Sequence, residues 1–234
     1  LGNSNVLGNY DYVSMLRAGP YYPFNNARNN SFYQAVLASP DKTWETIETA
    51  NGGLDIGLFN NRFNASFDYF VRKNNNMLVA LNAPATLGLT PNASNSAKLK
   101  TVGWEASAGW RDQVSSFNYW INLNISDNQN KIIKYDGQNV IAEGLNMVIE
   151  GMPINSIYGY EAQGYFMTQD EALNHAFQDS RTGPGDLKYV DKNKDNRIDG
   201  GSNRPDDHGD LVYIGNTSPR YTFGANLGVE WKGI

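Results

Sequence analysis

Apolar and polar residues alternate along five stretches of the chain, and a period of two is typical of β-strands with one apolar face. The stretches are 54–58, 62–71, 102–110, 117–126 and 221–231. In the second stretch, for example, Phe63, Phe67 and Val71 share one face. The polar residues of these stretches share the other face with glycine. The pattern therefore predicts at least five strands, each apolar on one side only.

The lengths of the strands and of their connections favour a membrane β-barrel over a soluble sandwich. Strands of roughly ten residues fit a lipid-facing wall, whereas soluble strands most often have about 5–6 residues. Short turns at Asn60-Asn61 and 111–116 alternate with long connections at about 72–101 and 127–217. Outer-membrane barrels have short periplasmic turns and long extracellular loops, and long irregular connections are uncommon in compact soluble domains. We therefore predict an all-β chain that forms part of a large antiparallel transmembrane β-barrel.

The same pattern predicts how the chain is divided. Residues 1–52 are expected to be mostly an extracellular loop region leading into a barrel strand, 53–126 four strands in two hairpins joined by the outer loop at about 72–101, 127–217 a long extracellular loop, and 218–234 a further strand. Large plugged transporters have about 22 strands. Five strands do not close such a barrel, so we expect other strands outside this chain.

Aromatic residues gather near the ends of the strands that the short turns join. They are Phe59, Phe63, Trp110, Phe117, Tyr119 and Trp231. In a membrane these rings would form the periplasmic aromatic girdle, because amphipathic rings prefer the headgroup level. The alternative is that they belong to the core of a sandwich.

Composition excludes several other classes of protein. The net charge of −5 and the scattered Lys and Arg residues give no basic stripe, so no nucleic-acid partner is expected. The absence of cysteine excludes disulfide scaffolds, thiolate zinc sites and cysteine nucleophiles. No run of 18 apolar residues supplies a spanning helix. Leu1 to Tyr10 lack the basic and apolar regions of a signal peptide.

Six stretches, in order, resemble motifs of the SusC/RagA-type TonB-dependent outer-membrane transporters. They are Thr43-Trp44-Glu45-Thr46 with Asn51-Gly52-Gly53-Leu54-Asp55-Ile56-Gly57-Leu58-Phe59-Asn60-Asn61-Arg62; Phe67-Asp68-Tyr69-Phe70 with Lys73 and Met77-Leu78; Val102-Gly103-Trp104-Glu105; Gly151-Met152-Pro153-Ile154-Asn155-Ser156-Ile157-Tyr158-Gly159-Tyr160 with Gly164-Tyr165-Phe166; Pro184-Gly185-Asp186-Leu187-Lys188-Tyr189-Val190-Asp191; and Gly215-Asn216-Thr217-Ser218-Pro219-Arg220-Tyr221-Thr222-Phe223-Gly224. Together they extend from about residue 43 to the end of the chain, which makes the set more specific than any single motif.

The resemblance implies a place in the bacterial cell outer membrane, in contact with outer-membrane lipid. It implies import of an oligomeric nutrient, a glycan or a peptide, energised by the TonB complex. It also implies a SusD-like surface lipoprotein that acts as a lid. The family's plug domain, through which TonB acts, is expected to be absent from this chain.

Residues 191–199 of the long loop contain oxygen-bearing side chains at alternate positions, as an EF-hand calcium loop does. The candidate metal-binding residues are Asp191, Asn193, Asp195, Arg197 and Asp199, with Arg197 contributing its backbone carbonyl. This spacing predicts a structural Ca²⁺, or Mg²⁺, that stiffens the loop. The alternative is a solvated acidic loop whose charges pair with its own Lys and Arg residues.

Two positions depart from the EF-hand pattern. Asn196 replaces the usual glycine at position 6, although Asn tolerates the left-handed backbone that this position needs. Ser202 replaces the bidentate Glu at position 12, so another carboxylate would have to serve, and Asp206, Asp207 or Asp210 could supply it.

Two further features of the long loop concern packing and recognition. Residues 168–177 are expected to form a short helix, with Thr168 as N-cap and Glu171 completing a capping box. Four aromatic residues are candidates for substrate or lid contact: Tyr158, Tyr160, Tyr165 and Phe166. The alternative is that these four pack the loop on itself.

No catalytic residue is indicated, and the chain is not expected to be an enzyme. Its two histidines, His175 and His208, lie far apart in the long loop. The carboxylates Asp55, Asp68, Glu105 and Glu230 lie on polar strand faces, where they would line a lumen. Two hypotheses compete with the transporter: a secreted, calcium-stabilised β-sandwich that binds carbohydrate, and a surface glycosidase, which would need a pair of carboxylates in a cleft.

Overall fold

The computed structural model describes residues 13, 15–34, 36–37, 39, 42–79, 85–137 and 139–232. The prediction about a signal peptide in Leu1 to Tyr10 lies outside these residues. The chain divides into two units: Leu1–Glu48 with Lys73–Leu99 and Ile133–Gln138, and Thr49–Arg72 with Lys100–Ile132 and Asn139–Ile234. Among the described residues, no helix has the length and apolarity needed to cross a membrane.

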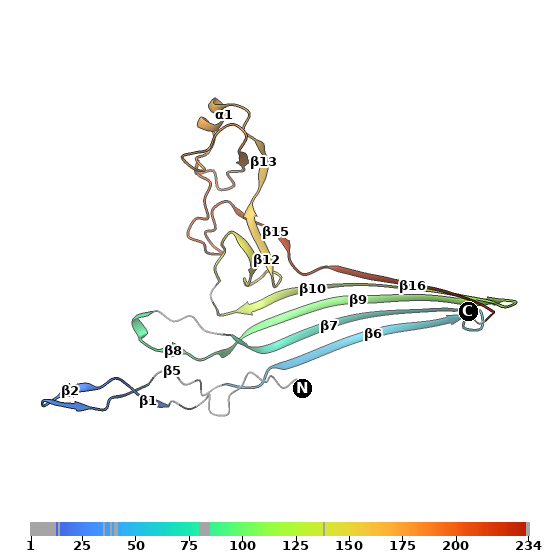
Figure 1. The fold of residues 1–234 in the computed structure, drawn as a ribbon, viewed down its shortest axis with the longest axis horizontal. Coiled ribbons are helices and arrows are strands. Elements are labelled where there is room, and N and C mark those ends of the chain that lie inside the picture. Colours follow the sequence, from blue (N-terminus) through green and yellow to red (C-terminus); the bar gives the residue numbers. More distant parts are fainter. Residues whose placement is uncertain are drawn as a thin grey trace. The chain divides into compact units, whose positions relative to one another are not determined.

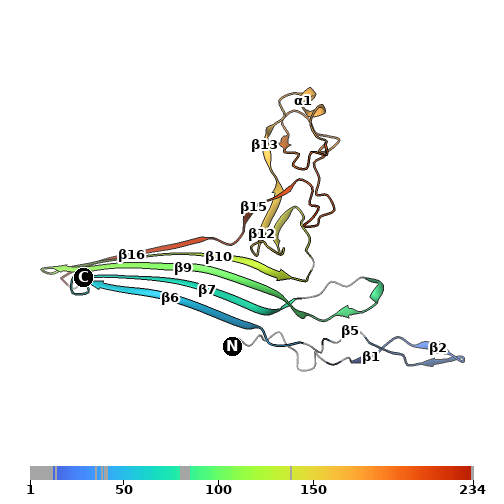
Figure 2. The same ribbon diagram turned by 180° about the vertical axis from the view of Figure 1, so that it is seen from behind.

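Five long strands form the main sheet, in the order β16-β10-β9-β7-β6 (Figure 1). They are β6 (Thr46–Leu58), β7 (Phe63–Val79), β9 (Ser94–Val114), β10 (Phe117–Tyr135) and β16 (Tyr221–Trp231). The five predicted strands are therefore confirmed. Four of them are longer than their alternating stretches, because backbone hydrogen bonding extends beyond the apolar pattern at one or both ends. Figure 2 shows the same sheet from behind.

The two short turns differ in how well the sequence located them. The first turn lies at residues 59–62, where Phe59, Asn60 and Asn61 have φ values of 54°, 55° and 62°. The second turn was expected at 111–116, but β9 extends to Val114 and only Ser115 and Ser116 form the turn. Polar side chains do not prevent a strand from continuing, because its ladder is made by backbone groups.

The apolar faces of adjacent strands coincide, as the register of β10 against β16 shows. Tyr119, Ile121, Leu123 and Ile125 lie opposite Val229, Leu227, Ala225 and Phe223. This apolar face is uncovered: Phe223 is 82 % exposed and Phe67 is 47 % exposed. A sandwich would bury such a face against a second sheet, so the sandwich hypothesis is wrong for the described residues.

The opposite face of the sheet combines polar residues with glycines that make room for large neighbours. A Cβ on Gly228 would lie 1.9 Å from Cζ2 of Trp120, and one on Gly109 would lie 2.7 Å from Oδ1 of Asn122. The Trp120 indole Nε1 donates a hydrogen bond of 3.2 Å to Asn226 Oδ1. Glycine at position 228 therefore leaves the space that the Trp120 ring occupies beside β16.

The long connection between β10 and β16 is a folded body with short strands. It contains β11 (Gly144–Met147), β12 (Ser156–Tyr160), β13 (Ala162–Tyr165), α1 (Gln169–Leu173), β14 (Leu187–Tyr189) and β15 (Leu211–Asn216). β11, β12 and β15 form a sheet, and β13 pairs with β14. Its core is made of Ile141, Ile149, Tyr158 and Leu211. Sequence patterns predicted only the helix in this region.

The first of the two units also contains short strands and one 3₁₀ turn. They are β1 (Leu16–Ala18), β2 (Tyr22–Phe24), β3 (Ala27–Asn29), β4 (Phe32–Gln34), β5 (Val36–Leu37), the 3₁₀ turn η1 (Ala85–Leu87) and β8 (Thr90–Pro91). β1 pairs with β4, β2 with β3, and β5 with β8. Much of the region predicted as loop in residues 1–52 is thus arranged in small hairpins.

Candidate functional site

Two of the motifs that resemble the transporter family meet at the base of the long connection. Ser156 on β12 lies opposite Asn216 on β15. The Asn216 side-chain amide donates to the Ile154 carbonyl at 2.6 Å, and the Ile154 N–H donates to Asn130 Oδ1 at 2.7 Å. These side chains bind backbone groups, so they hold the two ends of the folded body in one arrangement.

Two of the four candidate contact residues, Tyr158 and Phe166, are buried within the loop body. The Tyr158 ring lies 6.1 Å from that of Tyr213 in an edge arrangement, and the Phe166 ring lies 5.2 Å from that of His175. Burial also raises the pKa of Tyr158. The sequence left two roles open for these residues: contact with substrate or lid, and packing of the loop on itself. Tyr158 and Phe166 pack the loop on itself.

The other two candidates, Tyr160 and Tyr165, are more accessible. The Tyr160 ring is partly buried, 5.5 Å from the ring of Tyr189. Tyr165, at the end of β13, is 61 % exposed. The candidate surface for recognition therefore narrows to Tyr165 and to part of Tyr160.

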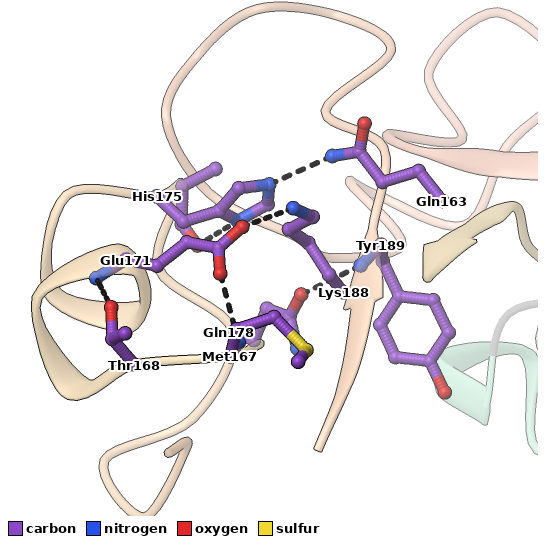
Figure 3. A network of polar contacts seen from close by, with 9 residues as sticks. Gln163, Met167, Thr168, Glu171, His175, Gln178, Lys188 and Tyr189 are labelled. Carbon is purple, nitrogen blue, oxygen red and sulfur yellow. Dashed lines mark hydrogen bonds and ion pairs between the residues drawn. The ribbon is translucent and has the colours of Figure 1, made fainter. Parts of the chain in front are cut away.

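Helix α1 is fastened by the capping residues that the sequence predicted (Figure 3). Thr168 Oγ1 accepts a hydrogen bond of 3.2 Å from the Glu171 N–H. The Glu171 carboxylate accepts one of 2.8 Å from the N–H of Met167, one residue before the N-cap. The predicted end of the helix at residue 177 is wrong: α1 ends at Leu173, because the backbone of Asn174 (φ −96°, ψ 0°) leaves the helical conformation. The Asn174 side-chain amide caps this end by donating to the Asp170 carbonyl at 2.8 Å.

Glu171 also connects α1 to β14, because its carboxylate forms an ion pair with Lys188 (Figure 3). The hydrogen bond from Lys188, followed by that from the Met167 N–H, lowers the pKa of Glu171. Beside this pair, the Gln178 side chain accepts from the Tyr189 N–H at 2.8 Å and donates to the Leu187 carbonyl at 3.0 Å. An ion pair therefore joins the helix to the strand, and the Gln178 hydrogen bonds hold the strand beside it.

In the acidic loop 191–199, side-chain carboxylates accept hydrogen bonds from the backbone N–H groups of the same loop. Asp191 accepts from the N–H groups of Lys194 at 2.6 Å and Asn196 at 2.9 Å, and Asp195 accepts from that of Arg197 at 2.8 Å. Asn196 has a φ of 66°, the left-handed conformation expected at position 6. Within the described residues, no three His, Asp or Glu side chains are grouped as metal ligands. Calcium binding by Asp191, Asn193, Asp195, Arg197 and Asp199 therefore stays a prediction.

Asp210, immediately before β15, holds this loop in place. The sequence indicated it only as one of three carboxylates that could replace the position-12 Glu. It is 0 % exposed. Its two oxygens accept hydrogen bonds of 2.6 Å from the Lys192 N–H and 3.1 Å from the Asp199 N–H. A buried carboxylate of this kind is stabilised by its N–H donors. Asp210 thus closes the acidic loop at both ends.

The polar face of the sheet surrounds a hollow of about 1340 Å³ near the short turns. Asp55 and Glu230, which were predicted to line a lumen, both line this hollow, as do Trp120 and Asn122. Ser66 and Ser107, which line it from the neighbouring strands β7 and β9, share a hydrogen bond of 2.7 Å. This face offers hydroxyl, amide and carboxylate groups for hydrogen bonding.

No protein-family model matches the chain. Its sequence is similar to "TonB-dependent receptor P3" of Formosa agariphila, with 28 % identity over 207 residues, 84 % of this chain and 20 % of that protein. It is also similar to "TonB-dependent receptor SusC" of Bacteroides thetaiotaomicron, with 27 % identity over 217 residues, 86 % of this chain and 20 % of that protein. The chain thus spans about a fifth of the length of these relatives.

Two solved structures have the same fold. The structure of the RagAB peptide transporter matches with a TM-score of 0.67 and 24 % identity, covering 98 % of this chain and 24 % of the other. The RagAB peptide importer in the "open-open" state matches with a TM-score of 0.69 and 24 % identity, covering 97 % and 23 %. The chain therefore has the fold of a wall segment of a large β-barrel. Its uncovered apolar face, its short turns and its long folded loop are the features of that class. The comparisons confirm the resemblance of the motifs: the chain is similar in sequence to TonB-dependent receptors, SusC among them, and in fold to part of the RagAB transporter.

Proposed function

We propose that this chain forms part of the wall and one extracellular loop of an outer-membrane importer of oligomeric nutrients, either glycans or peptides. The observation that carries the proposal is the main sheet, which leaves one long apolar face uncovered and places polar groups around a hollow on the other. Such a sheet is stable when acyl chains contact the apolar face and water contacts the polar face. Sequence similarity to TonB-dependent receptors supports energised transport, with TonB acting through a plug domain.

We also propose that a SusD-like lipoprotein covers the long loop. Apolar side chains are exposed at Tyr165, Met167, Leu173 and Phe177, all within one short segment of the loop body. Clustered apolar side chains on a protein surface commonly mark an interface with another protein. The polar hollow of the sheet would then lie on the substrate path rather than in the lid contact.

A bound Ca²⁺ in loop 191–199 is proposed as a structural component of this surface. The supporting observations are the alternating oxygens and the left-handed Asn196. Asp210 would supply the carboxylate that the missing position-12 Glu otherwise provides, since it already binds both ends of the loop. The ion would reduce the entropy cost of holding a long loop in one conformation.

The test is the orientation of the chain in cells that express the complete transporter without the SusD-like lipoprotein, which would cover Tyr165. This chain has no cysteine, so once any cysteine elsewhere in the transporter is replaced, Tyr165→Cys and Ser115→Cys can be compared with a membrane-impermeant maleimide. We expect Tyr165→Cys to react in intact cells, and Ser115→Cys to react only after the outer membrane is opened. If only Ser115→Cys reacted in intact cells, the chain would have the opposite orientation in the membrane, which would contradict the proposal.

A further inference from the structure

A second hollow, of about 660 Å³, lies where the sheet meets the base of the long loop. Its lining includes Tyr69 on β7, Lys100 and Trp104 on β9, Lys131 on β10, and Arg220 just before β16. It is distinct from the polar hollow near the short turns, with which it shares no lining residue. Three cationic side chains and two aromatic rings therefore surround one space.

The basic residues of this hollow extend from the apolar face of the sheet. Residues two apart on a strand share a face, so Lys100 lies on the same side as Val102 and Trp104. Trp104 stacks on Phe67, with ring centroids 6.3 Å apart, and Phe67 belongs to the uncovered apolar face. Lys131 has the same parity on β10 as Ile125, which lies opposite Phe223.

The hollow lies at the end of the apolar sheet face that is farthest from the short turns. Opposed apolar residues extend from Phe117–Trp231 beside the turn to Ile125–Phe223, and the next pair is Asp127–Tyr221. β16 has 11 residues, and about 9–11 residues of a tilted strand cross a bilayer. In a membrane, this edge is at the level of the lipid headgroups, where Tyr and Trp are also favoured.

The charges around the hollow are only partly balanced. Arg220 is paired with Asp127. Neither Lys100 nor Lys131 forms an ion pair within the described part of the chain. Two ammonium groups that line one space repel each other, and an anion between them removes that repulsion while gaining charge-assisted hydrogen bonds.

We propose that this hollow binds the phosphorylated headgroup of an outer-leaflet lipid. Lys100 and Lys131 contact the phosphate, and the acyl chains of the same lipid lie along Phe67, Ile125 and Phe223. A free phosphate ion would use the cations but gain nothing from the adjoining apolar surface, which is why a lipid fits better. The inference rests on the proposed membrane function, because it requires the apolar face to contact acyl chains.

The experiment uses the complete transporter in a non-ionic detergent, with bound lipid measured by native mass spectrometry. The probes are dioleoyl phosphatidic acid, dioleoyl phosphatidylcholine and inorganic phosphate. We expect preferential retention of phosphatidic acid by the unmodified protein. Each basic residue near an anionic lipid contributes roughly fivefold, so K100Q/K131Q should weaken binding about thirtyfold.

Three further variants accompany this one. R72Q/R111Q removes two positive charges from the opposite face of β7 and β9 and should bind phosphatidic acid as the unmodified protein does. K131Q alone changes one exposed side chain and should weaken binding roughly fivefold, which keeps the test usable if the double variant fails to fold. K100R/K131R should retain binding, because arginine also binds phosphate.

Several results would overturn the lipid site. They are equal binding of phosphatidic acid and phosphatidylcholine, unchanged binding by K100Q/K131Q, equal loss in R72Q/R111Q, and binding of inorganic phosphate without any preference for the phospholipid. Each of these would leave the membrane function standing if the transporter still needed detergent. A transporter that stayed monodisperse without detergent would instead contradict the membrane function itself.

Discussion

The Arg220 guanidinium binds the Asp127 carboxylate through two nitrogens, with Nε 3.0 Å from Oδ1 and Nη2 3.1 Å from Oδ2. Asp127 is a buried residue of β10, and Arg220 immediately precedes β16. The pair therefore joins the point where the chain leaves the apolar part of β10 to the point where it enters β16. A bidentate pair of this kind holds both orientation and distance.

The first prediction concerns this pair. Arg220→Gln should leave the buried Asp127 carboxylate without its ionic partner, which is more costly than losing both partners. We expect faster proteolysis of the loop body between β10 and β16 while the barrel itself remains folded. Asp127→Asn combined with Arg220→Gln should recover part of the resistance. Equal cleavage of the unmodified protein and Arg220→Gln would show that the pair does not hold the loop.

The second prediction concerns pH and the contact between α1 and β14. Since Lys188 lowers the pKa of Glu171 below its usual 4.5, the ion pair stabilises the folded loop above the ordinary pKa of a glutamate. This contribution is lost as the pH falls through the lower pKa of the folded state. The protection of the α1 amides, measured as the ratio of the intrinsic to the observed hydrogen-exchange rate at each pH, should therefore fall as the solution is acidified below about pH 4.5.

Lys188→Met is the matched variant for this measurement. It removes the cation and keeps a side chain of similar length, so the acid-dependent loss of protection of α1 should shrink. An unchanged pH profile in Lys188→Met would assign the acid sensitivity to another group.

The third prediction concerns calcium. If the loop 191–199 binds Ca²⁺, adding the ion at about one hundred times its dissociation constant should stabilise the loop by about 2.7 kcal/mol. The measurement is hydrogen exchange of the loop with Ca²⁺ and with a chelator. D191N/D195N should abolish the difference, whereas Asp179→Asn, outside the loop, should not. Identical exchange with calcium and with chelator would contradict the calcium site.

The fourth prediction concerns the polar face of the sheet. A methyl group at Gly228 would overlap the Trp120 ring, at 1.9 Å from Cζ2. Gly228→Ala should therefore displace the indole from Asn226 and reduce the yield of heat-resistant folded barrel. Gly52→Ala is the control, because a Cβ there meets nothing within 4 Å. Trp120→Ala in the Gly228→Ala background should restore the yield. If it did not, overlap with the Trp120 ring would not be the cause of the lower yield.

The sequence predicted the sheet because a period of two survives wherever one face contacts lipid and the other contacts water. Residues such as Ile121 and Leu227 belong to long alternating stretches, and their pairing follows directly. The turn after β9 was misplaced because Arg111–Val114 carry no apolar alternation although their backbone remains in the strand.

The loop body was less predictable because its structure depends on contacts between distant segments. Its strands have only 3–6 residues, too few for a periodic pattern. Its core joins Ile141 and Ile149 to Leu211, and no local pattern indicates that contact. The importance of Asp210 likewise depends on burial, since several aspartates near it in sequence look equivalent.

The most direct test of the account is the environment of two adjacent residues on β16, Leu227 and Asn226. Leu227 lies on the apolar face and Asn226 on the polar face. A spin label would be attached to Leu227→Cys or Asn226→Cys of the complete transporter in lipid bilayers, and its collisions with oxygen and with a water-soluble nickel complex compared. We predict that the label at 227 collides mainly with oxygen, as it would among acyl chains. The label at 226 should collide mainly with the nickel complex, as it would in water. Equal access of the nickel complex to both positions, or protection of 227 from both reagents, would contradict a lipid-facing wall.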